Sequence, residues 1–332
     1  MEKLKHFLSE HRIKKRFITT FLNYHRPGDK KDILILSSPR SGSTLLMELL
    51  YTQPGIKYIN EPLDKSVLDH FGFLPIRTRW DYLNLDPYEQ RAIKYYFQNS
   101  KEIKYFGPTD VFDKNYKFFS NRRVFKVIRA NALIEWFMKE LDMEIIYLIR
   151  HPIAQSLSCI NRGHHCAIAE YLQDHDFSET YLNKEQKSFA QQVFESGSLL
   201  EKFVVEWCLD NLAPLYTCKT HNFLTASYEE LVLKPRKVIG LLCDKLDLPD
   251  RDRMLSRIRT PSRVTDTSTM QTKDMIRKGD RNFLVSKWEK YVSESETRRA
   301  FEILHQFDIK VYRFGSYLAR YDLLDFKHQK GK

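Results

Sequence analysis

The sequence predicts an α/β fold in which a mostly parallel sheet is covered by helices on both faces. Five short apolar runs, at 32–37, 56–60, 123–128, 143–149 and 223–228, are separated by spacers long enough to form helices. Near-continuous apolar strands of this kind are typical of parallel sheets that are buried on both faces. Ligands of such folds bind at the carboxyl ends of the strands, so we expect functional residues there.

Helical patterns follow four of these runs. They are predicted at 43–52, 131–141, 152–163 and 229–248. Pro152 suits the first turn of its helix, and Pro235 interrupts the last helical stretch. Within that stretch a core-facing stripe is predicted from the spacing of Val238, Leu241, Leu242 and Leu246.

Residues 62–121 and 160–200 are richer in polar and aromatic residues and show weaker periodicity. They are predicted to be insertions over the sheet that form the walls of a substrate site. Each lies between predicted strands, so both are expected to belong to the same domain as the sheet.

The composition is that of a globular protein with a sizeable core, since 42% of the 332 residues are hydrophobic. No run of 18 or more apolar residues occurs, and the first residues lack the pattern of a secretory signal, so a cytoplasmic location is expected. The five cysteines form neither a disulfide framework nor a CxxC pair. His164, His165 and Cys166 are adjacent and would point in different directions, so no metal is expected.

A formal net charge of +11 favours anionic partners. These include nucleic acid, an acidic membrane surface, or a phosphorylated or sulfated small molecule. Residues 1–31 hold nine Lys or Arg against three Asp or Glu. They are predicted to form a basic helical leader that is either solvated or makes peripheral contact with a membrane.

The segment "SSPRSGSTLL" at 37–46 joins the first apolar run to the first helix. Gly42 lets the backbone curl towards a ligand, while Ser43 and Thr44 supply hydroxyl and N–H groups at the helix start. Arg40 adds a positive charge. The segment therefore predicts a phosphate-binding turn, although a simple helix cap has the same composition. It lacks the Gly-Lys-Ser/Thr ending of a nucleotide triphosphatase loop.

Two further segments favour phosphate binding. In "LIRHPIAQSLS" Arg150 ends the fourth strand and Ser158 follows two helical turns later, so a charge and a hydroxyl can reach one phosphate. In "IRKGDRNF" at 276–283 a second cluster combines the side chains of Arg277 and Lys278 with N–H groups beside Gly279. Two separate anion sites indicate a ligand that carries phosphate at both ends.

These three segments, in this order, resemble the sulfotransferases that use 3′-phosphoadenosine 5′-phosphosulfate (PAPS). The resemblance covers about residues 32–290 and implies the P-loop-like sulfotransferase fold, with one domain at 32–325 after the leader at 1–31. It implies that the 5′-phosphosulfate is held by the loop residues Pro39, Arg40, Ser41, Gly42, Ser43 and Thr44. It implies that Arg150 and Ser158 hold the 3′-phosphate, and that a loop with Arg277, Lys278 and Gly279 closes over it. No metal is implied.

The general base is expected at Glu61. The cytosolic branch of the family has a His after a Lys-Thr near the third strand, whereas Lys126 is followed here by Val127, Ile128 and Arg129. "INEPL" at 59–63 resembles the carbohydrate and tyrosylprotein branches, where a Glu past the second strand is the base. A carboxylate there would deprotonate an acceptor hydroxyl, and Arg40 would neutralise the leaving oxygen. The alternative is that Glu61 only stabilises a turn before Pro62.

Other charged and aromatic residues have two open interpretations. Lys126 and Arg129 either bind an acidic acceptor or the phosphosulfate, or are solvated strand ends. Tyr228, in a segment that resembles the family's "YEDL", either lies near the nucleotide or is core. His151 is expected to orient backbone, and Trp207 to pack rather than to touch a ligand.

The resemblance to carbohydrate sulfotransferases favours a sugar or glycoconjugate hydroxyl as acceptor. A tyrosine, lipid or small-metabolite acceptor stays open, as does a PAPS-binding protein without catalysis. Two other classes of protein are disfavoured. A P-loop kinase would need a Gly-Lys-Ser/Thr loop, and the sequence has none. A nucleic-acid-binding protein would fit the positive charge, but no recognised domain signature accompanies that charge. The oligomeric state is not indicated by the sequence.

Overall fold

The computed structural model describes residues 24–63, 86–99, 116–262 and 270–324. Its main sheet has the strand order β3-β5-β2-β6-β7, and all neighbouring strands are parallel. The strands are β2 (Asp32–Ser37), β3 (Ile56–Asn60), β5 (Arg122–Ile128), β6 (Met143–Ile149) and β7 (Leu224–Ser227). The predicted parallel sheet, flanked by helices, is confirmed.

Strand β2 lies at the centre of the sheet and pairs with β5 on one side and β6 on the other. The chain passes from one side of β2 to the other between β5 and β6. The carboxyl end of β2 is therefore a topological switch point, where open α/β sheets bind their ligands.

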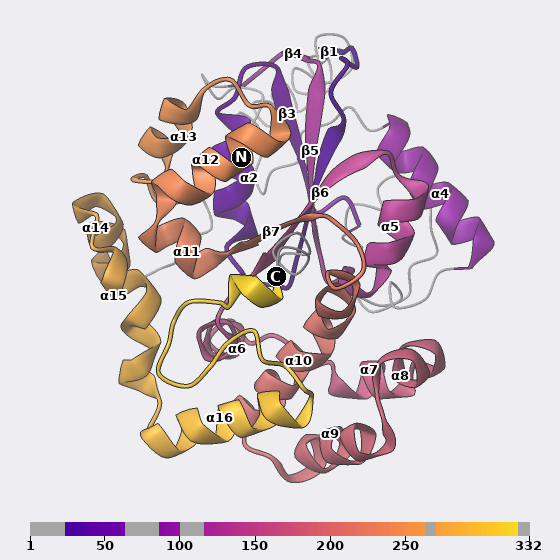
Figure 1. Ribbon diagram of the computed structural model, residues 1–332, viewed down its shortest axis with the longest axis vertical. Helices are drawn as coiled ribbons and strands as arrows, with labels where there is room; N and C mark the ends of the chain where they lie inside the picture. Colours follow the sequence, from indigo (N-terminus) through magenta and orange to yellow (C-terminus); the bar gives the residue numbers. More distant parts are fainter. Residues whose placement is uncertain (1–23, 64–85, 100–115, 263–269, 325–332) are drawn as a thin grey trace, which may run out of the picture.

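Alternation along β2 divides the core into two layers. Ile33 and Ile35 pack with α2 (Ser43–Tyr51) and α12 (Pro235–Leu246) on one face. Leu34 and Leu36 pack on the other face with α4 (Pro87–Asn99) and α5 (Ile134–Glu140). Figure 1 shows these helices on opposite sides of the sheet. Side chains alternate between faces because the period of a strand is two.

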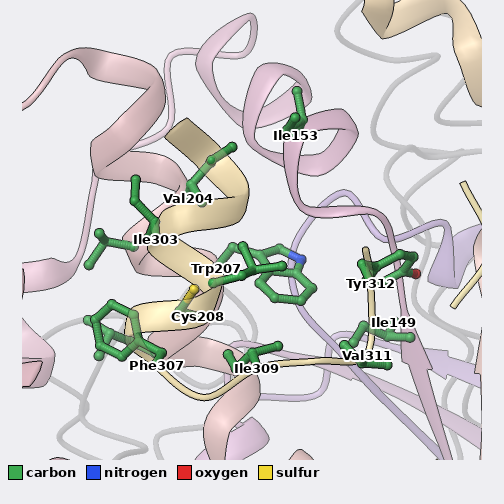
Figure 2. Packing of buried hydrophobic residues seen from close by; sticks show 14 of the residues in the cluster. Ile149, Ile153, Val204, Trp207, Cys208, Ile303, Phe307, Ile309, Val311 and Tyr312 are labelled. Carbon is green, nitrogen blue, oxygen red and sulfur yellow. The ribbon is translucent and has the colours of Figure 1, made fainter. Parts of the chain in front are cut away.

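A third hydrophobic cluster lies beyond the carboxyl ends of the strands. It joins α6 (Pro152–Ile160), α10 (Leu199–Thr217) and α16 (Glu294–Gln306) (Figure 1). Trp207 is at its centre, with Ile149, Ile153 and Tyr312 around it (Figure 2). This buried tryptophan fixes α10 close to the end of β6.

Helices fill most of the predicted insertion at 160–200. They are α7 (Ile168–Gln173), α8 (His175–Tyr181) and α9 (Lys184–Ser196). Their side chains Tyr171, Phe177 and Val193 are buried in the same cluster as Trp207. In the other insertion, 62–121, α4 covers the sheet through Ile93 and Phe97, while residues 64–85 and 100–115 lie outside the described residues.

The helical stretch predicted at 229–248 is interrupted at Pro235 as expected, with α11 (Tyr228–Leu233) before it and α12 beginning at Pro235. Two other expectations change. Leu241 is 42% exposed and does not belong to the core stripe, whereas Val238, Leu242 and Leu246 are buried. The helical leader does not extend through residue 31, since β1 (Tyr24–His25) pairs with β4 (Phe119–Ser120). Residues 1–23 of that leader lie outside the described residues.

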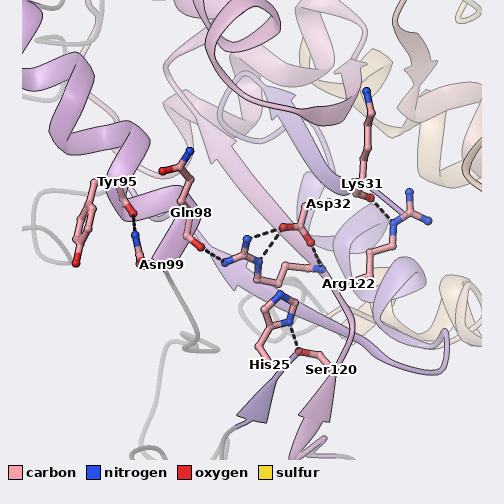
Figure 3. Close-up of polar contacts among 9 residues, drawn as sticks. His25, Lys31, Asp32, Tyr95, Gln98, Asn99, Ser120 and Arg122 are labelled. Carbon is pink, nitrogen blue, oxygen red and sulfur yellow. Dashed lines mark hydrogen bonds and ion pairs between the residues drawn. The ribbon is translucent and has the colours of Figure 1, made fainter. Parts of the chain in front are cut away.

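The amino ends of the strands carry structural polar contacts. Asp32 at the start of β2 pairs with the guanidinium of Arg123 at 2.6 Å, and Arg123 also donates to the carbonyl of Gln98 at the end of α4. Figure 3 shows this group beside the His25–Ser120 contact between β1 and β4. The Arg123 contacts bind α4 to the edge of the main sheet that lies opposite the switch point, and the His25–Ser120 contact joins the two strands of the small sheet. Lys57 on β3 donates to the carbonyls of Tyr24 and Phe118 and so joins the small sheet to the main one.

The remaining helices are α13 (Arg251–Arg257), α14 (Met270–Lys278) and α15 (Arg281–Ser286). Three short 3₁₀ helices occur as well: η3 (Asn131–Leu133), η5 (Lys287–Tyr291) and η6 (Tyr321–Leu323). Helices α14 and α15 pack on α11 at the side of the switch point. None of the helices in the described ranges is long and apolar enough to cross a membrane.

Candidate active site

The turn after β2 has the backbone of an anion-binding loop. Arg40 and Gly42 both have left-handed backbone, with φ of 68° and 90°. Ser41 stabilises the turn through its hydroxyl, which donates to the carbonyl of Ser38 at 2.8 Å and to Gln155 Oε1 at 3.2 Å. Gly42 is the N-cap of α2 and provides no side-chain cap. Because helix N-termini favour negative charge, this turn suits a phosphate group.

The predicted 3′-phosphate residues lie next to this turn. Arg150 Nη1 donates to the carbonyl of Arg40 at 2.8 Å, and Arg40 Nε donates to Ser158 Oγ at 3.1 Å. The structure therefore brings together the two segments that the sequence marked separately.

Tyr228 belongs to this site. The guanidinium of Arg150 lies 4.6 Å from the centre of the Tyr228 ring. The same ring packs on Gly42, where an added Cβ would lie 2.4 Å from Tyr228 Cδ2. Tyr228 therefore lies beside the turn and also packs against the buried cluster of Val232, Leu284 and Val285, and its contact with a nucleotide stays a prediction.

Glu61 is paired with Lys126 at the ends of β3 and β5. Lys126 Nζ lies 2.7 Å from Glu61 Oε1, 2.9 Å from Asn60 Oδ1 and 3.4 Å from Thr44 Oγ1. Both side chains of the pair are largely buried. Burial lowers the pKa of Lys126, and the carboxylate of Glu61 opposes this shift. Because Lys126 contacts both Glu61 and Thr44, it joins the carboxylate of Glu61 to the phosphate-binding turn.

Three strained residues follow adjacent strands. Glu61 after β3 has φ of 49°, Arg129 after β5 has φ of 68°, and Arg40 follows β2. Non-glycine residues rarely adopt this conformation, and those that do cluster at functional sites. The amide of Glu61 donates to the carbonyl of Lys126 at 2.8 Å, which holds the strained turn. The backbone strain thus marks the same edge as the charged side chains.

Lys287 is a further cation near Arg150 and Arg40 that no motif in the sequence marked. It begins η5, and burial followed by the charges of Arg150 and Arg40 lowers its pKa to about 8. Both arginines are therefore close enough to disfavour its protonated form. No spacing in the sequence connects Lys287 to the phosphate-binding turn, because it arrives there only when α15 packs on α11.

Arg277 and Lys278 end α14, and Gly279 follows with φ of 74°. The side chain of Arg277 is 68% exposed and lies 3.7 Å from Asp274. No contact recorded for the described residues joins Arg277 to Arg150 or Ser158. Closure of this segment over the 3′-phosphate stays a prediction.

His151 and Trp207 support Arg150 from behind. The buried His151 ring stacks on Trp288 with centroids 4.7 Å apart, and its backbone N–H donates to Glu229 Oε1. Burial, followed by the charge of Arg150, lowers the pKa of His151 to about 3, so the ring is neutral at physiological pH. Trp207 Nε1 donates to the carbonyl of Arg150 at 3.0 Å. Both residues have the packing and backbone roles that were expected.

The remaining candidates lie outside this cluster. His165 Nε2 contacts Glu170 Oε1 at 2.7 Å, and Cys166 Sγ donates to the carbonyl of Lys202. Within the ranges that the structure describes, no three His, Cys, Asp or Glu side chains are grouped so as to hold a metal ion. The other predicted loop residues, Pro39 and Ser43, lie within the turn itself.

Comparison with known families agrees with this geometry. A model of the sulfotransferase domain matches residues 30–313. The chain belongs to the sulfotransferase family. It is a sulfotransferase enzyme, as the three segments of the sequence predicted.

This chain is similar to solved sulfotransferase structures, among them the following two. The sulfotransferase domain of the Synechococcus PCC 7002 olefin synthase is 19% identical over 88% of this chain and 99% of that chain, with a TM-score of 0.44. A mouse sulfotransferase complexed with PAP is 16% identical over 89% of each chain, with a TM-score of 0.45. No curated protein matches the sulfotransferase described here.

Gly42→Ala is expected to lower stability by about 3 kcal/mol, because the new Cβ meets the Tyr228 ring and the backbone is left-handed. Gly163→Ala is the matched control, since Gly163 has φ of 62° with no atom within 4 Å of an added Cβ. It should lose only about 1 kcal/mol. Urea unfolding measures both, and equal losses would show that Tyr228 does not constrain the turn.

Proposed function

We propose that this sulfotransferase moves the sulfuryl group of PAPS to a hydroxyl group of a sugar or glycoconjugate, with Glu61 as general base. The observation that carries the proposal is the direct contact between two of the three predicted phosphate-binding segments, the turn at 38–44 and the segment with Arg150 and Ser158. Arg150 bonds to the backbone of Arg40, and Arg40 bonds to Ser158. A ligand with an anion at each end fits such a pair of adjacent cationic segments better than a single phosphate does.

The 5′-phosphosulfate is assigned to the turn at 38–44 and the 3′-phosphate to Arg150 and Ser158. Arg40, Arg150 and Lys287 repel one another, and burial lowers the pKa values of Arg40 and Lys287. A ligand with several negative charges would relieve this repulsion. Tyr228, packed on the turn and under Arg150, would border the nucleotide.

The transfer step needs one base and one charge-neutralising group. Glu61 takes the proton of the acceptor hydroxyl on Oε2, because Lys126 occupies Oε1. The acceptor oxygen then bonds to sulfur while the bond between sulfur and the bridging phosphate oxygen breaks. The leaving oxygen keeps the electron pair, and Arg40 neutralises its charge. The released product is adenosine 3′,5′-bisphosphate.

Lys126 orients this carboxylate. It contacts Glu61, Asn60 and Thr44 together and so joins the base to the phosphate-binding turn. This placement supports a catalytic role for Glu61 over that of a simple turn residue, since a turn before Pro62 needs no buried cation. Positioning of a base within such a network is what general-base catalysis requires.

The acceptor class rests on the segment "INEPL", which resembles carbohydrate sulfotransferases. A cytoplasmic location and peripheral membrane contact through residues 1–31 are further proposals that rest on the composition of the sequence. A screen of acceptors with radiolabelled PAPS tests the class directly. Transfer to tyrosine, lipid or small-metabolite hydroxyls, but not to sugars, would replace the carbohydrate assignment.

Adenosine 3′,5′-bisphosphate should bind in calorimetry far more tightly than ATP with magnesium, because two anion sites match its two ends. Arg150→Ala and Arg277→Ala should each weaken this binding about tenfold or more, as each removes a charge-assisted contact. Arg298→Ala is the control, since Arg298 is exposed and pairs with Glu294 on α16. Equal binding of ATP and the bisphosphate would contradict the PAPS assignment. Wild-type affinity in both arginine variants would contradict the 3′-phosphate assignment.

Binding of the bisphosphate should weaken as pH rises above 8. Lys287 has a pKa of about 8 in the free protein, and a bound anion favours its protonated form. Affinity is therefore full below pH 8 and should fall about tenfold by pH 9. Lys287→Met should bind more weakly at pH 7 and lose this dependence. Lys290→Met, on the exposed side of the same turn, should retain it. Equal slopes in all three proteins would exclude Lys287 from the site.

Glu61→Gln should leave bisphosphate affinity nearly unchanged while single-turnover sulfate transfer falls roughly 10²- to 10⁴-fold, because Gln cannot accept the hydroxyl proton. The variant leaves Lys126 without its counter-ion, so its melting temperature should fall. Glu61→Gln/Lys126→Met removes that unpaired charge and should recover stability but not turnover. A rate for Glu61→Gln within about threefold of wild type would exclude Glu61 as the base.

A further inference from the structure

Helix α10 contacts both anion-binding segments from behind. Trp207 Nε1 donates to the carbonyl of Arg150 at 3.0 Å. One turn later, Asn211 Oδ1 accepts a hydrogen bond of 3.3 Å from Ser38 Oγ, at the start of the phosphate-binding turn. Ser38, Trp207 and Asn211 are each only 1% exposed. The same helix therefore holds the end of β2 and the end of β6.

These contacts close into a circuit. Asn211 Nδ2 donates to the carbonyl of Trp207 at 2.7 Å, which joins the two contacts on the helix. On the ligand side, Arg150 Nη1 donates to the carbonyl of Arg40, two residues after Ser38. We name this closed set of bonds through Ser38, Arg40, Arg150, Trp207 and Asn211 the α10 circuit.

The buried amide of Asn211 is held on several sides. Its Oδ1 also accepts a hydrogen bond from Tyr147 on β6, and Ser38 Oγ in turn accepts one from Asn131 Nδ2 at 3.2 Å. Hydrogen bonds to both ends of the buried amide restrict the arrangement of Asn211. Figure 2 shows Trp207 enclosed by Ile149, Ile153 and Tyr312, so the indole cannot follow a shift of Arg150.

We propose that Asn211 is a positioning residue that fixes the distance between the two anion sites. This inference rests on the proposed function, in which one nucleotide binds both sites at once. Once the first phosphate is bound, the second binds with an effective concentration that depends on how well the spacing of the sites matches the ligand. Opening the α10 circuit should leave each site able to bind a phosphate but should weaken the joint binding.

The test compares three ligands by calorimetry: adenosine 3′,5′-bisphosphate, adenosine 5′-monophosphate and adenosine 3′-monophosphate. Asn211→Leu removes the three hydrogen bonds of the amide, to Ser38, Tyr147 and Trp207, and bisphosphate affinity should fall about five- to tenfold. The affinities of both monophosphates should change less than about twofold. A role in folding alone would lower the melting temperature without changing the ratio of bisphosphate to monophosphate affinity.

Trp207→Phe opens the same circuit at Arg150 and keeps an aromatic ring in the core, so it tests the proposal even where Asn211→Leu does not fold. It should change the affinity ratio in the same way, and the double variant should be no worse than the more affected single variant. Thr217→Val is the matched control. It removes a 3.2 Å bond from the buried Thr217 hydroxyl, at the far end of α10, to Glu135 without touching the circuit, and its ratio should equal that of wild type.

The outcomes separate the two proposals. An unchanged ratio in both Asn211→Leu and Trp207→Phe, with wild type still preferring the bisphosphate, would overturn the positioning role alone. Independent, multiplicative effects in the double variant would also overturn it, because the two residues would then not belong to one circuit. A wild-type protein that binds the bisphosphate no better than the monophosphates would overturn the proposed function and, with it, this inference.

Discussion

Parallel pairing of β2 with both β5 and β6 places three strand ends at one edge of the sheet, and every functional contact depends on it. The turn after β2 lies between Arg129, which follows β5, and Arg150, which follows β6. With β3 on the far side of β5, Glu61 reaches the same edge. A different strand order would leave the same residues separated across the sheet.

Positive charge accumulates at this edge, as the proposed binding of a polyanion requires. Arg40, Lys126, Arg150 and Lys287 lie there, and Glu61 is the carboxylate that pairs with Lys126. Burial lowers the pKa values of Lys126 and Lys287, and the neighbouring guanidinium groups lower that of Lys287 further. Bringing these cations together is unfavourable for folding by itself, and a bound anion offsets the repulsion. The strained backbone at Arg40, Glu61 and Arg129 has the same explanation, since surrounding contacts hold a conformation that serves the site.

Rigid support comes from the cluster beyond the sheet. Trp207, His151 and Tyr312 are buried there, and none of them faces the proposed ligand directly. They fix the backbone of Arg150 through the indole N–H and through Glu229, which accepts from the His151 amide and from the Tyr312 hydroxyl at 2.9 Å. The helices of residues 160–200 thus contribute to the site through packing, in addition to any contact with an acceptor.

The sequence by itself determined the sheet, the helices on its two faces and the glycine turn between β2 and α2, and it marked Arg150 and Ser158 as candidate anion-binding residues. These follow from local patterns, because apolar periodicity and a Ser/Gly turn before a helix act over a few residues. Only the tertiary structure decided which distant residues meet. The packing of α15 on α11 brings Lys287 to this edge of the sheet. Lys126 lies beside Glu61 because β3 pairs with β5. Asn211 contacts Ser38 although the two residues are 173 positions apart in the sequence. Leu241 shows the same limit, since its spacing fits the core stripe while its side chain lies at the surface. Side-chain partners at such separations depend on strand order and helix rotation, which no local pattern encodes.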